Sequence, residues 1–207
     1  MVLPPEVRNG IREVMLAMQE CDEVLEQFTF PIMEACPSEI EPARLIQTLR
    51  EPWRSRQLTD LHSADLPGVA DIRKLSYASR LMISAVAGLL HQQTENIPEN
   101  FHSCIMETGL GRIGIFGKSR DTIEGNFCLL MDFGGDDLYT GNIASPEYPH
   151  KPVSITVDYA GNDSYCPEGG HLVASHLGVG MLVDLAGDDL YRSDRPGMGS
   201  ADRKSVV

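Results

Sequence analysis

Apolar residues recur every three or four positions in the first part of the chain. In residues 5–28 they form one stripe among charged neighbours: Val7, Ile11, Val14, Met18, Cys21, Leu25 and Phe28. This spacing places them on one face, so it predicts an amphipathic helix of about seven turns. A second helix is predicted between Ser38, which opens a capping-box pattern, and Pro52, which ends it. A third is predicted over residues 67–91, with an apolar stripe at Val69, Ile72, Leu75, Met82, Val86 and Leu89.

The pattern changes after residue 110, where short apolar runs are each followed by a Gly/Asp turn and a tyrosine. Three copies of one phrase start at Asp132, Asp158 and Asp184, and the step between successive copies is 26 residues. A strand, a turn and a tyrosine at a fixed period of this length indicate a stacked repeat architecture. Residues 117–123 resemble a shorter first copy, in which Ile123 lies opposite Tyr139.

We therefore expect an α+β chain, with an N-terminal α-helical region followed by a parallel, β-helix-like β-solenoid. The expected organisation is a helical domain at 1–95, a linker at 96–110 and solenoid repeats with a period of about 26 at 111–201. Residues 202–207 resemble the translation of a sequencing adapter, so we expect a non-native tail there and a chain that is a fragment. Further repeats of the same chain would then be a partner of this segment.

Stacking would place equivalent side chains of successive repeats about 4.8 Å apart, in columns. Asp132, Asp158 and Asp184 would form one column, and the tyrosines another, with their hydroxyls at the surface. Carboxylates at that spacing repel each other, so backbone N–H groups or a calcium ion must compensate. The candidate calcium ligands are Asp132, Asp136, Asp137, Asp158, Asp163, Asp184, Asp188 and Asp189.

Composition narrows the function classes. The formal net charge of −13 argues against nucleic acid as a partner. The longest apolar run, residues 81–90, is too short to span a bilayer. The five cysteines are scattered and without a CxxC pair, which supports neither a disulfide framework nor a zinc site. The N-terminus has no signal-peptide pattern.

Two family resemblances follow from these residues. The Gly-Asp-Asp and Gly-Asn-Asp turns are similar to the calcium-binding repeats of secreted bacterial RTX proteins, although the period here is not nine. Residues 179–191, VGMLVDLAGDDLY, more closely resemble uncharacterised bacterial proteins with tandem LLVDLAGDDxY repeats. That likeness covers about residues 111–194. It implies a repeat scaffold, often in exported or envelope-associated proteins, and no established activity.

The first functional hypothesis is a non-enzymatic repeat scaffold with a structural, surface or partner-binding role, whose partner is a protein or a glycan. It follows because every distinctive residue recurs in each repeat, whereas catalytic groups usually occur once. The alternatives are a calcium-stabilised RTX-like module and a polysaccharide-acting β-helix enzyme that uses paired carboxylates. The column of Asp136 and Asp188 is interrupted by Asn162, and no pair of acids is marked above the others. No residue is assigned a catalytic or cofactor-binding role, and calcium is the one candidate cofactor.

Overall fold

The computed structural model describes residues 3–34, 72–91, 97–147, 151–167, 170–176, 178–193 and 201–202. These residues form two helices, α1 (Pro5–Glu34) and α4 (Ile72–Leu90), together with parallel and mixed sheets. The α+β class predicted from the sequence is confirmed. The second predicted helix, the start of the third and residues 203–207 lie outside the described residues. No described helix has the length and apolar character needed to cross a membrane.

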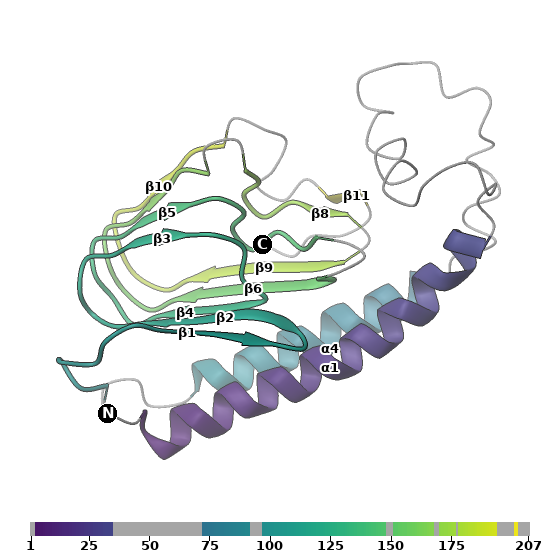
Figure 1. Cartoon of the computed structure of the whole chain (residues 1–207), viewed down its shortest axis with the longest axis horizontal. Coiled ribbons are helices and arrows are strands. Elements are labelled where there is room, and N and C mark those ends of the chain that lie inside the picture. The colour runs from purple at the N-terminus through teal and green to yellow at the C-terminus, as the bar shows by residue number, and fades with distance from the viewer. Residues whose placement is uncertain are drawn as a thin grey trace.

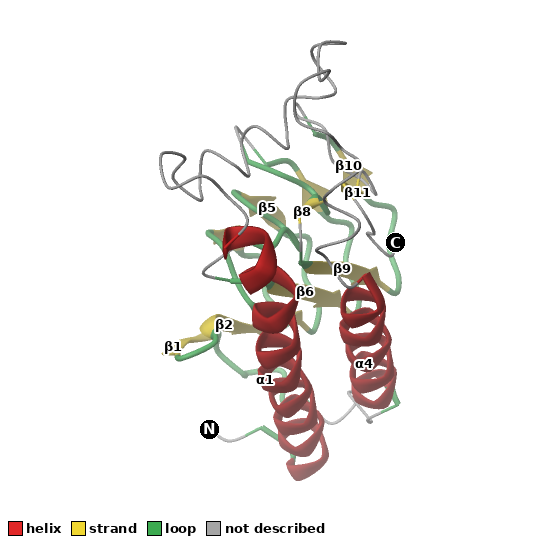
Figure 2. Cartoon of the chain, turned by 90° about the vertical axis from the view of Figure 1, so that its right-hand side faces the viewer, coloured by secondary structure: helices red, strands yellow, loops and turns green. Residues whose placement is uncertain are grey.

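Both helices present the predicted stripe to the interior. In α1 and α4 the buried apolar side chains are those that the spacing selects: Val7, Ile11, Val14, Met18, Cys21 and Leu25, then Leu75, Met82, Val86 and Leu89. The two helices pack side by side against one face of a sheet (Figures 1 and 2). The apolar stripe therefore finds its partner in the β part of the chain.

The larger sheet has five strands in the order β1-β2-β4-β6-β9. They are β1 (Cys104–Thr108), β2 (Gly111–Phe116), β4 (Leu129–Asp132), β6 (Val153–Asp158) and β9 (Val179–Asp184). All pairings are parallel except that of β1, which runs antiparallel to β2. The segment predicted to be a linker, residues 96–110, thus contains a strand.

The smaller sheet has four parallel strands in the order β10-β7-β5-β3. They are β3 (Thr122–Glu124), β5 (Leu138–Thr140), β7 (Ser164–Tyr165) and β10 (Leu190–Tyr191). Ile123 pairs with Tyr139, which confirms the alignment predicted for the shorter first copy. A third, two-stranded sheet pairs β8 (Ser175–His176) with β11 (Ala201–Asp202) in parallel.

We call each strand of the large sheet, the turn after it and the following strand of the small sheet a unit. Units 1 to 4 are β2–β3, β4–β5, β6–β7 and β9–β10, and their turns, residues 117–121, 133–137, 159–163 and 185–189, are the corners. Successive units lie beside one another in register, as Figure 1 shows.

The central strands of the large sheet, β4 and β6, are buried on both faces, as expected for parallel strands with near-continuous apolar runs. Leu129, Met131 and Ile155 belong to the cluster that the helices cover. Leu130, between Leu129 and Met131, lies in a second cluster with Ile123 and the tyrosines of the small sheet. Helices and strands thus share one apolar core, and the division into separate helical and repeat domains stays a prediction.

Candidate functional site: the stacked corners

Glycine lets the corners approach one another closely. Gly135 and Gly161 have positive φ angles of 135° and 156°. A Cβ on Gly161 would lie 1.9 Å from the carbonyl oxygen of Gly135 in the preceding corner. No side chain fits there, so the spacing of the corners requires glycine.

The first column of acids lies inside the protein, where each unit leaves the large sheet. Asp132 pairs in register with Asp158, and Asp158 with Asp184, as the constant spacing predicts. Asp132 and Asp158 are 0% and 1% exposed. Each receives a local backbone N–H: Asp132 Oδ1 accepts from Gly134, and Asp158 Oδ1 from Ala160.

The tyrosines stack face to face beside this column. The ring centroids of Tyr139 and Tyr165 are 4.5 Å apart, and those of Tyr165 and Tyr191 are 4.8 Å apart. The tyrosine ladder is therefore as predicted, but the prediction of surface hydroxyls is wrong. Tyr139 and Tyr165 are fully buried, because the inner face of the small sheet turns their rings towards the first column.

The buried hydroxyls hold the first column. The single hydrogen of Tyr139 Oη is shared between Asp132 Oδ2 at 2.9 Å and Asp158 Oδ2 at 2.6 Å. Tyr165 Oη donates to Asp158 Oδ2 at 2.7 Å, and Tyr191 donates to Asp184. Hydrogen bonds to buried carboxylates of this kind contribute about 1.5–3 kcal/mol each. The column is thus stabilised by a parallel ladder of phenols.

The second column, formed by Asp137, Asp163 and Asp189, joins one corner to the next through backbone hydrogen bonds. The N–H of Asp137 donates to Asp163 Oδ1 at 2.7 Å, and the N–H of Asp163 donates to Asp189 Oδ1 at 2.8 Å. Asp121 of the first corner donates to Asp137 in the same way. Backbone N–H groups therefore compensate these carboxylates, one of the two arrangements that the sequence left open.

The third column, formed by Asp136, Asn162 and Asp188, lies at the surface, and its N–H groups donate to the preceding corner instead of the following one. The N–H of Asn162 donates to Asp136 Oδ1 of the preceding corner at 3.0 Å, and the Asn162 side chain donates to the same oxygen at 3.1 Å. The N–H of Asp188 donates to Asn162 Oδ1 at 3.0 Å. These bonds give the Asp136 carboxylate and the Asn162 amide a structural role, whereas Asp188 contributes its backbone N–H.

Buried carboxyl groups in these columns keep their protons to unusually high pH. Burial, together with the nearby carboxyl groups of Asp137 and Asp158, raises the pKa of Asp132 to about 9. Burial likewise raises the pKa of Asp163 to about 7, with Asp158 adding to the effect. Asp137 Oδ2 and Asp163 Oδ2 are buried and have no hydrogen-bond partner among the described residues. We infer that the buried acids of a unit share a proton instead of carrying two charges.

No group of three or more His, Cys, Asp and Glu side chains in the described part of the chain is arranged to hold a metal ion. Several carboxylate oxygens named as candidate calcium ligands already accept hydrogen bonds from tyrosine or backbone donors. A cation would have to displace those donors or the shared proton. Calcium binding by the eight acids stays a prediction.

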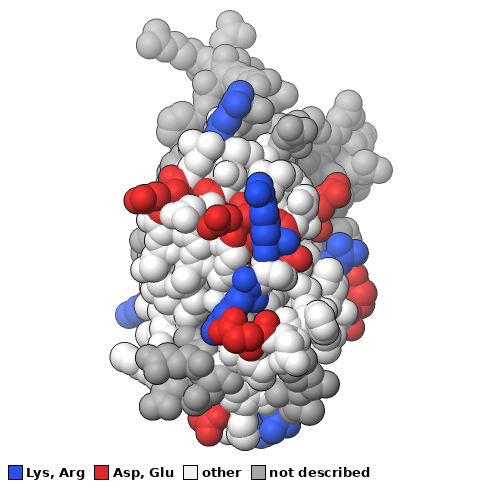
Figure 3. Space-filling view, turned by 90° about the vertical axis from the view of Figure 1, so that its left-hand side faces the viewer, with Lys and Arg blue, Asp and Glu red and all other residues white. Residues whose placement is uncertain are grey.

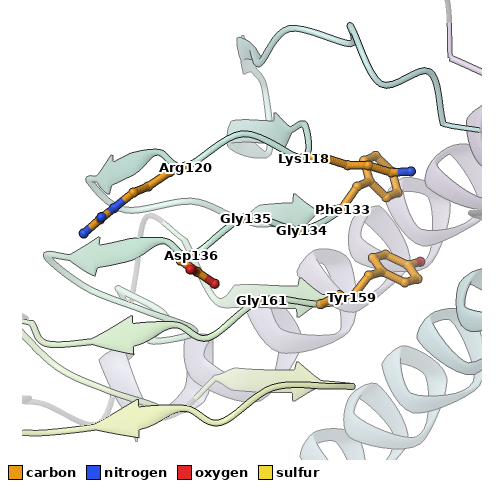
Figure 4. A pocket seen from close by; sticks show the side chains of 9 residues that line it. Lys118, Arg120, Phe133, Gly134, Gly135, Asp136, Tyr159 and Gly161 are labelled. Carbon is orange, nitrogen blue, oxygen red and sulfur yellow. The ribbon is translucent and has the colours of Figure 1, made fainter.

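A cleft of about 690 Å³ crosses the first three corners. Its lining includes Lys118, Arg120, Asp136 and the ring of Tyr159 (Figure 4). This cleft was not predictable from the repeat spacing, because its lining comes from three separate corners. The signal available was that Lys118 and Arg120 stand where later corners carry small or acidic residues.

The fold and these contacts define an α+β protein with parallel, in-register units and hydrogen-bonded Gly/Asp corners. No family model, curated protein or solved structure matches this chain.

Proposed function

We propose that residues 111–193 form a parallel β-solenoid and that this solenoid is a non-enzymatic scaffold for binding a partner. Two sheets that pair in parallel at the same offset support this architecture, because each unit then contacts mainly its neighbours. The helices cover the outer face of the larger sheet and supply the rest of the apolar core.

The contacts that the repeated side chains make support the functional part of the proposal. The acids and tyrosines of units 2 to 4 bond to their counterparts in adjacent units or to each other within a unit. Side chains engaged in this way hold the stack and are poorly placed to act on a substrate. A role in structure and in presenting a surface therefore accounts for them better than catalysis does.

A repeat insertion tests the scaffold. A second copy of residues 159–184, inserted after Asp184, adds one whole period and keeps every corner in register. We expect a soluble, folded protein whose β content rises in circular dichroism and whose melting temperature is not lowered. The matched control inserts residues 166–178, which contain no corner, after Asp184; it moves the fourth corner out of register and should lower the melting temperature. Equal damage by both insertions would refute the repeat scaffold.

A calcium-stabilised module is the second candidate, and the partnerless oxygens Asp137 Oδ2 and Asp163 Oδ2 favour it. Carboxylate oxygens are the ligands that calcium prefers. Calorimetry with millimolar calcium and then with a chelator decides this point, because a bound ion raises the melting temperature by mass action. An unchanged melting temperature eliminates calcium and leaves the scaffold proposal standing.

A further inference from the structure

The cleft across the corners is the feature of the described surface that the repeat does not explain. It lies between the ends of β2, β4 and β6 and the starts of β3 and β5, and glycines of two corners form part of its floor. In Figure 4, Arg120 lies at one end, Lys118 and the rings of Phe133 and Tyr159 at the other, and Asp136 between them. The cleft is therefore elongated along the corner face.

Two cations in this cleft break the pattern of the units. The hydrogen bond from Asp121 to Asp137 aligns the first two corners, so Arg120 corresponds to Asp136 and then to Asn162. Lys118 corresponds to Gly134 and then to Ala160 by the same alignment. Since residues that hold the stack recur in every unit, two cations confined to the first corner call for a different role.

Neither cation is strongly engaged. Lys118 forms an ion pair with Glu99 at 3.1 Å, but the Glu99 side chain is 85% exposed. Exposed ion pairs of this kind hold a side chain only weakly. The exposed Arg120 guanidinium has no partner among the described residues. Figure 3 shows that basic side chains lie among acidic ones on the corner face, so the positive potential is local. An anionic group of a ligand would find two available donors here.

An aromatic wall completes the cleft beside Lys118. Tyr159 stacks on Phe133 with ring centroids 5.3 Å apart and an interplanar angle of 26°. Its hydroxyl is buried without a hydrogen-bond partner among the described residues, and burial raises its pKa to about 12. The phenol is therefore neutral, and because its oxygen is buried, only the ring of Tyr159 is available to a ligand. A partly exposed flat ring next to cations suits a ligand that has both an apolar ring face and carboxyl oxygens.

We propose that this cleft binds a short anionic oligosaccharide of the uronic-acid type. The carboxylates of two sugar units pair with Arg120 and Lys118, and one sugar ring lies near Tyr159. An oligosaccharide fits better than a phosphate or a small carboxylate because the two cations lie at opposite ends of the cleft (Figure 4). This proposal rests on the proposed scaffold function, since it names the partner that the scaffold would bind.

Isothermal titration of the whole chain with tetragalacturonate tests the site. The informative variant is the double substitution Lys118→Ala and Arg120→Asn, which installs the residues that the third corner already carries at Ala160 and Asn162. We expect the wild type to bind and this variant to bind about tenfold more weakly or not at all. Its melting temperature should not change, which separates a lost ligand contact from a lost fold.

The matched control makes the same two substitutions at cations of α4 that do not line the cleft, Lys74→Ala and Arg80→Asn, and should bind as the wild type does. Tyr159→Phe keeps the ring and removes only the buried hydroxyl, so it should bind as the wild type does. No heat of binding with the wild type, or equal binding by the Lys118/Arg120 variant, would overturn the proposal. Equally tight binding of hexaglutamate would overturn it too, by showing that charge alone is recognised.

These outcomes are independent of the repeat-insertion experiment, because the inserted segment follows Asp184 and leaves the first three corners intact. A folded insertion variant with no affinity for tetragalacturonate would reject the ligand and retain the scaffold.

Discussion

Replacing Asp163 with asparagine should stabilise this protein at alkaline pH, although Asp163 is 1% exposed and hydrogen-bonded. Asparagine keeps the side-chain oxygen that accepts the N–H of Asp137 at 2.7 Å. Its amide also supplies a donor on the side where Asp163 Oδ2 has no partner. The variant therefore provides permanently the hydrogen that the aspartate pair must take from solvent.

The pKa of Asp163 sets the size and the sign of this effect. The unfolded carboxyl has a pKa of 3.8, whereas burial raises the folded pKa to about 7. The folded state thus binds more protons between these values, so stability is highest at acid pH and falls as the pH rises through this window. The shift sets an upper bound of about 4 kcal/mol, and solvent next to the corner reduces the expected change to about 1–2 kcal/mol.

Urea unfolding at a series of pH values measures this change. We expect Asp163→Asn to exceed the wild type in free energy of unfolding at pH 8, and the difference to shrink or reverse near pH 4. Asp188→Asn is the control, because Asp188 occupies the adjacent column in an exposed position. A variant that is less stable than both wild type and control at pH 8 would refute the shared-proton interpretation.

Three further outcomes follow from the same contacts. Tyr165→Phe removes the hydroxyl that donates to Asp158 at 2.7 Å, and chemical denaturation should show a loss of about 1.5–3 kcal/mol with an unchanged m-value. Gly161→Ala places a methyl group against the preceding corner and should lower the free energy of unfolding, measured by the same denaturation, by about 3 kcal/mol or more. Gly88→Ala, with nothing within 4 Å of the added methyl group, should raise it by about 0.5–1 kcal/mol. Because burial raises the pKa of Asp132 to about 9, the wild type should continue to lose stability between pH 7 and pH 9, and a flat profile there would contradict a protonated Asp132.

The register of the units was predictable because a constant spacing leaves one consistent alignment. Asp132, Asp158 and Asp184 had to become neighbours once their strands paired in parallel. The positions of the helix stripes were predictable for a similar reason, since a helical period assigns each side chain to a face. These predictions needed only distances along the chain.

Other features depend on information that spacing does not hold. The inward direction of Tyr165 could not be read from β7, which is only two residues long and gives no alternation to compare. β1 was missed because its side chains are mostly exposed and carry no apolar alternation. The cleft combines side chains from three corners, and its clue was the loss of the pattern at Lys118 and Arg120.

The opposed directions of the two outer hydrogen-bond columns have a mechanical consequence. Asp137 donates forward to Asp163, while Asn162 donates backward to Asp136, so neighbouring corners are linked in both senses. Displacing one corner would break hydrogen bonds to both neighbours, leaving N–H donors without acceptors on one side and acceptors without donors on the other. The corners should therefore resist shear together and detach as a block, which would make the β part stiff under tension and abrupt in its rupture.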